Sequence, residues 1–170
     1  MPSKAYEGNL EFLNSLPETS GLSFDERRSN FEDQASQLPV AVNVSGEALS
    51  VDNITAEWIV PAQAQERSTI IYLHGGGYCI GSINTLRGMV THISPAAGIK
   101  SLLINYRLAP EHLYPTALED STTAYKWLLS QGIAPGEIII AGDSAGGGLS
   151  VSTMLSSKAK VKAYWRSLHF

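Results

Sequence analysis

Hydrophobic and polar residues follow two patterns along the chain, and each pattern predicts a different element. Near-continuous apolar runs occur at residues 69–73, 101–106 and 137–141. Such runs are typical of parallel strands that are buried on both faces. Helical periodicity separates these runs, at residues 85–97 and 116–131. The alternation predicts βαβ crossovers, and therefore an α/β fold: a three-layer sandwich around a mostly parallel sheet.

The N-terminal part of the chain has a different pattern. Apolar residues cluster within residues 10–16, and residues 24–38 place their charged positions on one expected face. Both segments predict helices. Strands are expected at residues 40–44 and 55–60, and the second of these alternates polar and apolar positions. We therefore expect helices to precede the sheet.

The last predicted strand leads directly into the sequence G-D-S-A-G-G at residues 142–147. G-x-S-x-G after a strand is typical of a nucleophile elbow, a sharp strand-to-helix turn that lifts the serine hydroxyl above the sheet. The small residues Gly142 and Gly146 let the strand and the helix approach closely. The pattern predicts Ser144 as the nucleophile of an esterase. Its neighbour Asp143 points elsewhere on such a turn and is interpreted as structural.

A second glycine-rich stretch, H-G-G-G-Y at residues 74–78, follows another predicted strand. Consecutive glycines allow backbone N–H groups to approach a ligand without side chains in the way. In acyl transfer these N–H groups hold the oxyanion of the tetrahedral intermediate, together with the N–H of the residue after the nucleophile, here Ala145. Both stretches follow parallel strands, so they are expected on the same edge of the sheet.

These motifs resemble one known family. H-G-G-G-Y, the run Y-R-L-A-P-E-H at residues 106–112 with P-T-A-L-E-D at 115–120, and G-D-S-A-G-G look like the ordered signatures of the hormone-sensitive-lipase-like branch of the α/β-hydrolases. The resemblance covers residues 5–155. It implies an α/β-hydrolase sandwich, and the chain looks like the N-terminal portion of such an enzyme, ending after the nucleophile elbow.

The resemblance also assigns roles to individual residues. Ser144 is the implied nucleophile, Gly75 and Gly76 with Ala145 supply the oxyanion hole, and His74 braces the glycine loop by hydrogen bonding. It implies small-molecule esters with short to medium acyl chains as substrates, and no metal or cofactor. The N-terminal helices would form part of a cap over the acyl pocket. The alternative is a pair of packing helices that contact no ligand.

A complete catalytic triad is not visible in the sequence. After Ser144 there is no Asp or Glu, and the only histidine is His169. Glu111 and His112 precede the serine, whereas the chain order in this fold is Ser, then Asp or Glu, then His; both are interpreted as part of the site wall. The predicted function is a carboxylic-ester hydrolase by lineage. The alternative is a catalytically inactive fragment or a ligand-binding relative that does not hydrolyse esters.

Composition limits the remaining possibilities. The chain has 170 residues, of which 44% are hydrophobic and 16% are charged, as expected for one globular core. Its single cysteine, Cys79, cannot form an internal disulfide and is expected as a small buried residue. No run of 18 apolar residues occurs, so no membrane span is expected. A cytoplasmic location is the default interpretation.

Charge is unevenly distributed. The formal net charge is −4, yet residues 156–170 contain four basic residues and no acidic one. This basic tail also diverges from the family, and we interpret it as a solvated terminus, with no nucleic-acid partner. We therefore expect cap helices over residues 1–38, a partial α/β-hydrolase core over 39–155 and a divergent basic tail over 156–170. If the strand at 137–142 lies at a sheet edge, the chain can self-associate there.

Overall fold

The computed structural model describes residues 3–15 and 21–157. Two helices precede the sheet, and strands and helices then alternate to the nucleophile elbow and its helix. In chain order the elements are α1 (Lys4–Ser15), α2 (Phe24–Ser36), β1 (Val44–Val51), β2 (Ile54–Pro61), β3 (Gln65–Leu73), α3 (Ile83–Ala97), β4 (Ile99–Ile104), α4 (Thr116–Ser130), the 3₁₀ turn η1 (Pro135–Glu137), β5 (Ile138–Gly142) and α5 (Ala145–Ser156).

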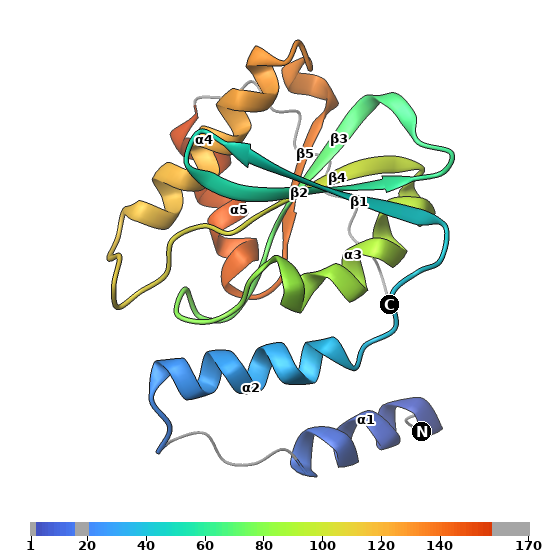
Figure 1. The fold of residues 1–170 in the computed structure, drawn as a ribbon, viewed down its shortest axis with the longest axis vertical. Helices are drawn as coiled ribbons and strands as arrows, with labels where there is room; N and C mark the ends of the chain where they lie inside the picture. Colours follow the sequence, from blue (N-terminus) through green and yellow to red (C-terminus); the bar gives the residue numbers. More distant parts are fainter. Residues whose placement is uncertain (1–2, 16–20, 158–170) are drawn as a thin grey trace.

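The described strands form one sheet in the order β1-β2-β4-β3-β5. β4, β3 and β5 are parallel neighbours, whereas β2 runs antiparallel to both β1 and β4. Four of the five strands therefore point in the same direction. This sheet and its flanking helices confirm the predicted α/β fold (Figure 1).

Alternate residues of the central strands face opposite helical layers. Ile70 and Tyr72 of β3 belong to the hydrophobic cluster on the α3 side. Ile71 and Leu73 belong to the cluster on the side of α4 and α5. Because successive side chains of a strand point to opposite faces, a strand that is covered on both faces must be apolar at nearly every position. That requirement explains the continuous apolar runs in the sequence.

Capping residues in the sequence set both ends of the helix α3. Ser82 and Thr85 form a capping box at its N-terminus, in which each side chain bonds the backbone of the other. At its C-terminus Gly98 adopts φ 69°, a left-handed conformation that favours glycine. α3 therefore starts directly after the glycine loop, and its position fixes the end of that loop.

The prediction of a strand at residues 40–44 is wrong. Residues 40–43 lie outside regular structure, and Val42 is 92% exposed. The strand β1 instead occupies Val44–Val51, whose sequence V-S-G-E-A-L-S-V mixes polar and apolar residues without strict alternation. β1 lies at the edge of the sheet and is mostly exposed to solvent, so it does not need the apolar residues that a buried strand requires.

The helix α2 lies beside the core and is not inserted into it. Figure 1 shows it apart from the sheet, next to α3, and none of its described residues is buried. A capping box formed by Ser23 and Glu26 fixes its first turn. None of the helices in residues 3–15 and 21–157 is both long enough and apolar enough to cross a membrane. The predicted basic tail lies, from residue 158 onward, outside the described residues.

Candidate active site

The turn between β5 and α5 holds Ser144 in an unusual backbone conformation. Its φ is 48° and its ψ is −118°, and it occupies the N-cap position of α5. Positive φ is uncommon for residues other than glycine, and such strain is often found at functional sites. The side chain of Ser144 is exposed. The described residues provide no hydrogen-bond partner for its Oγ atom.

Two glycines make this turn possible. A Cβ atom at Gly146 would overlap the carbonyl oxygen of Leu73, and one at Gly142 would lie 2.6 Å from the same oxygen. The end of β5, the start of α5 and the end of β3 therefore pack backbone against backbone. This close approach explains why both outer positions of G-x-S-x-G are glycine here.

The glycine loop lies beside this turn, at the carboxyl ends of neighbouring parallel strands. Leu73 pairs with Gly142 in the register of β3 and β5. Directly beyond that pair, the N–H of Gly75 donates to Oδ1 of Asp143 at 2.9 Å. Asp143 thus ties the glycine loop to the serine turn. The sequence interpretation of Asp143 as structural did not identify this partner, which is 68 residues away.

His74 is buried beneath the glycine loop. Its Nδ1 atom lies 2.8 Å from the carbonyl oxygen of Gly75, and because a carbonyl only accepts, Nδ1 carries the proton. The ring stacks on Tyr106, with centroids 4.0 Å apart, and the Tyr106 hydroxyl donates to the His74 carbonyl at 2.6 Å. Burial lowers the pKa of His74, which favours the neutral ring.

Among the described residues, the backbone N–H groups of Gly76, Gly77 and Ala145 donate to no acceptor. Gly76 and Gly77 have φ of 110° and 61°, which favour glycine. Ala145 begins α5, where the first N–H groups have no partner within the helix and the helix dipole favours negative charge. The N–H of Gly75, by contrast, is already donated to Asp143.

The other candidates from the sequence lie elsewhere. Glu111 pairs with Arg28 of α2, with 2.7 Å between Oε2 and Nη2. His112 lines a cavity of about 380 Å³ next to the glycine loop. Cys79 is half-buried and has a free thiol. His169 lies outside the described residues.

The cavity has a mostly apolar wall. It is bordered by Gly77 and Tyr78 of the glycine loop, by Leu118 of α4 and by Leu149 of α5. Its volume lies within the range of about 300–1,000 Å³ that is usual for small-molecule sites. Within residues 3–15 and 21–157, no group of three or more His, Cys, Asp or Glu side chains is placed to hold a metal ion.

Comparison with known proteins identifies the family and the fold of the chain. A family model described as alpha/beta hydrolase fold matches residues 70–166. An acetyl-hydrolase of Streptomyces hygroscopicus is 44% identical over 109 residues, which are 64% of this chain and 36% of that protein. A crystal structure of an esterase from the bacterial hormone-sensitive lipase family is 39% identical with a TM-score of 0.81, and the match covers 89% of this chain.

A crystal structure of an esterase/lipase from an uncultured bacterium is 40% identical, with a TM-score of 0.83 over 91% of this chain. The match covers 52% of that structure and 50% of the hormone-sensitive lipase family esterase. The chain therefore spans about half the length of these solved structures. These matches confirm the family that the sequence motifs predicted.

Proposed function

This chain belongs to the α/β hydrolase fold family, and we propose that it carries the nucleophile and the oxyanion hole of a serine carboxylesterase. The observation that carries the proposal is the backbone of Ser144, whose φ of 48° holds the serine at the tip of a glycine-flanked turn. The relatives named acetyl-hydrolase and esterase support the same reaction class.

In the proposed reaction, Ser144 Oγ attacks the ester carbonyl and the carbonyl oxygen becomes an oxyanion. The N–H groups of Gly76, Gly77 and Ala145 are the donors that we assign to this oxyanion. Gly77 takes the place that the sequence gave to Gly75, because the Gly75 N–H is donated to Asp143. Removal of one such donor typically costs about 2.7–4 kcal/mol of transition-state stabilisation.

We assign a supporting role to His74 and Asp143. The neutral ring of His74 holds the Gly75 carbonyl, and the carboxylate of Asp143 holds the Gly75 N–H. Hydrogen bonds therefore hold both the N–H and the carbonyl of Gly75, so the backbone that leads into Gly76 has a fixed direction. Preorganised donors of this kind need no rearrangement when the charge develops.

We propose small esters with short to medium acyl chains as substrates. The cavity beside Gly77 and Tyr78 has the apolar lining and the volume that such a chain needs. No side chain among the described residues is placed to accept the proton of Ser144. After Ser144 the sequence contains no Asp or Glu and only one histidine, His169. We therefore expect the 170-residue chain alone to turn over esters at a near-background rate.

The test is hydrolysis of p-nitrophenyl acetate and p-nitrophenyl butyrate by the purified chain, compared with Ser144→Ala and His169→Ala. Near-background turnover is expected because a site without its general base keeps only the residual catalysis of its oxyanion hole. Robust turnover that Ser144→Ala abolishes would show that a base is present after all. Turnover that His169→Ala also abolishes would identify that base.

A second candidate function is ligand binding without hydrolysis. Ser144 is exposed, lies near an apolar cavity and has no partner for Oγ within residues 3–15 and 21–157, which favours this candidate for the chain alone. Equilibrium dialysis with a ketone analogue of the ester separates the two proposals. Binding of the ketone that survives Ser144→Ala supports a binding function, whereas binding that requires Ser144 indicates hemiketal formation at the nucleophile.

A further inference from the structure

The helix α2 is attached to the core by polar contacts. Arg28 and Glu32 lie four positions apart, which places them on one face of the helix. Glu32 accepts a hydrogen bond from the Ser82 hydroxyl, at the point where the glycine loop becomes α3. Arg28 reaches the middle of the same loop. No described residue of α2 is fully buried, and these side-chain contacts tie the helix to the glycine loop and to the start of α3.

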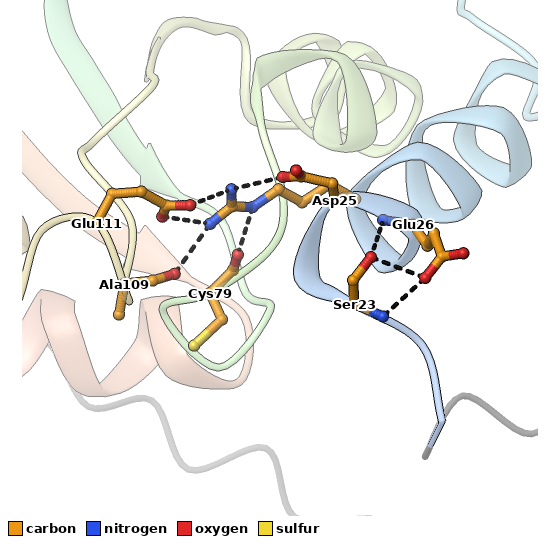
Figure 2. A network of polar contacts seen from close by, with 7 residues as sticks. Ser23, Asp25, Glu26, Cys79, Ala109 and Glu111 are labelled. Atoms are coloured by element: carbon orange, nitrogen blue, oxygen red, sulfur yellow. Dashed lines mark hydrogen bonds and ion pairs between the residues drawn. The ribbon is translucent and has the colours of Figure 1, made fainter.

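Arg28 uses every donor of its guanidinium group. Nε donates to the carbonyl of Cys79 at 2.8 Å, and Nη2 donates to the carbonyl of Ala109 at 2.9 Å. Nη1 and Nη2 each donate to the carboxylate of Glu111, at 2.9 Å and 2.7 Å. Nη1 also donates to Asp25 at 3.4 Å. Figure 2 shows these acceptors around the guanidinium group, drawn from three separate segments of the chain.

Both carbonyls that Arg28 binds belong to residues that shape the glycine loop. The N–H of Cys79 donates to the carbonyl of Gly76 at 3.0 Å. The N–H of Ala109 donates to the carbonyl of Tyr78 at 2.8 Å. The Cys79 carbonyl shares its peptide group with the Ile80 N–H, which donates to the carbonyl of Gly76 at 3.0 Å. Arg28 therefore holds one side of a peptide group whose other side holds Gly76, and it holds the carbonyl of the residue whose N–H holds Tyr78. The loop is fixed at its start by Asp143 and at its middle by Arg28.

We propose that Arg28 is a positioning residue for the oxyanion hole, because it fixes the direction of the Gly77 N–H: Arg28 holds the Cys79–Ile80 peptide group, whose N–H holds the Gly76 carbonyl, and that carbonyl shares its peptide group with the Gly77 N–H. The proposal rests on the proposed function for its catalytic meaning. Gly76 and Gly77 have wide conformational freedom, so an unanchored loop would sample other directions. Lysine cannot replace Arg28, because a single ammonium does not reproduce the planar fork that reaches two carbonyls and one carboxylate together.

The test measures amide hydrogen exchange by NMR in the full 170-residue chain. In Arg28→Met, the N–H groups of Cys79, Ile80 and Ala109 should exchange about 10 to 100 times faster, since a hydrogen bond to a charged group is lost at each carbonyl. Arg28→Lys should give an intermediate increase. The matched control is Arg87→Met, which removes a bidentate ion pair with Glu57 between α3 and β2, away from the loop.

Faster exchange confined to the loop in Arg28→Met, and absent in Arg87→Met, supports the proposal. Unchanged loop exchange in Arg28→Met overturns it, as does an equal increase in both variants, which would mean a general loss of stability. A cavity variant, Arg28→Ala, provides chemical rescue: millimolar guanidinium should restore the slow exchange, and failure to restore it counts against the proposal. Should Arg28→Met not fold, Arg28→Lys with the same control decides.

Turnover gives a separate readout. If a polypeptide that corresponds to the remaining half of a solved relative restores hydrolysis of p-nitrophenyl acetate when added to the chain, Arg28→Lys should lower kcat with little change in KM, because the oxyanion contacts form only in the transition state. A change in KM alone would contradict a positioning role. Amide exchange needs no turnover, so unchanged loop exchange in Arg28→Met overturns the positioning role whatever the p-nitrophenyl ester assays of the proposed function give, and those assays can fail while the Arg28 contact stands.

Discussion

At the residue scale, the serine turn requires glycine at positions where a Cβ atom would collide with neighbouring backbone atoms. We predict that Gly146→Ala destabilises the chain by about 1–3 kcal/mol, as expected for overpacking against a backbone that cannot move freely. The added Cβ would overlap the Leu73 carbonyl and approach the His74 carbonyl at 2.7 Å. Urea unfolding followed by circular dichroism measures the change.

The control for this prediction is Gly136→Ala. A Cβ atom at Gly136 would meet nothing within 4 Å, and its φ is not in the left-handed region. This variant should be neutral or stabilised by about 0.4–1 kcal/mol, since alanine restricts the unfolded chain. Equal losses in the two variants would show that the crowding at Gly146 is relieved by movement of β5 and α5.

The sequence predicted the residues whose motifs are local, and it did not predict residues that act through distant partners. Ser144 and its flanking glycines form a pattern within six positions, and the turn follows from that pattern. Arg28 contacts carbonyls that are 51 and 81 residues away. No spacing rule connects such positions, because the contact exists only after α2 and the two loops have come together. For the same reason, the sequence did not predict that the N–H of Gly75 donates to Asp143.

At the element scale, the strength of the contact between α2 and the core depends on pH, because Arg28 of α2 pairs with the ionised carboxylate of Glu111. The hydrogen bonds from Arg28 lower the pKa of Glu111 to about 2. A free glutamate titrates near 4.3, so the folded-state pKa lies below the unfolded one. The stabilising contact is therefore fully present above about pH 4.3 and is lost as the pH falls toward 2.

We predict that an NMR titration of the Glu111 side chain gives a midpoint near 2 in the parent chain. In Arg28→Met the midpoint should rise toward about 4.3, the value of an unpaired glutamate. Arg87→Met, which leaves this pair intact, should not move it. A midpoint that is the same in the parent chain and in Arg28→Met would mean that the pair does not persist in solution.

Apolar periodicity predicted the buried elements and failed for the exposed ones. β3, β4 and β5 are covered on both faces or lie beside covered strands, so burial dictates their composition. β1 is a mostly exposed edge strand, and its mixed polar and apolar sequence shows neither a continuous apolar run nor a strict alternation. The mainly apolar run at residues 40–44 led to a strand prediction at that place instead. In the structure, Val42 contacts solvent and lies outside the sheet.

At the scale of the whole molecule, the described sheet has two different edges. β1 ends the sheet on one side with a strand that contains the charged residue Glu47. Charged side chains on an edge oppose pairing with another chain. β5 ends the sheet on the other side with the uncharged sequence I-I-I-A-G, and Ile139 is 49% exposed. Short, β-prone and uncharged segments at an edge favour association.

We therefore predict that the chain self-associates through β5, where a second copy would pair with the backbone groups that have no strand partner among the described residues. Size-exclusion chromatography with light scattering should show oligomers that increase with concentration. Ile139→Lys should shift the chain toward monomer, because a charge at the exposed edge position opposes strand pairing. Val42→Lys adds the same charge to a residue that is 92% exposed and lies outside the sheet, and it should leave the oligomers unchanged.

A polypeptide that corresponds to the remaining half of a solved relative should compete for the same edge and lower the oligomer fraction. This follows because a strand added beside β5 would satisfy the same backbone groups as a second copy. A parent chain that stays monomeric at every concentration and melts cooperatively would contradict the prediction. It would mean that the edge of β5 is already covered in solution, and the expected effect of Ile139→Lys on assembly would then disappear.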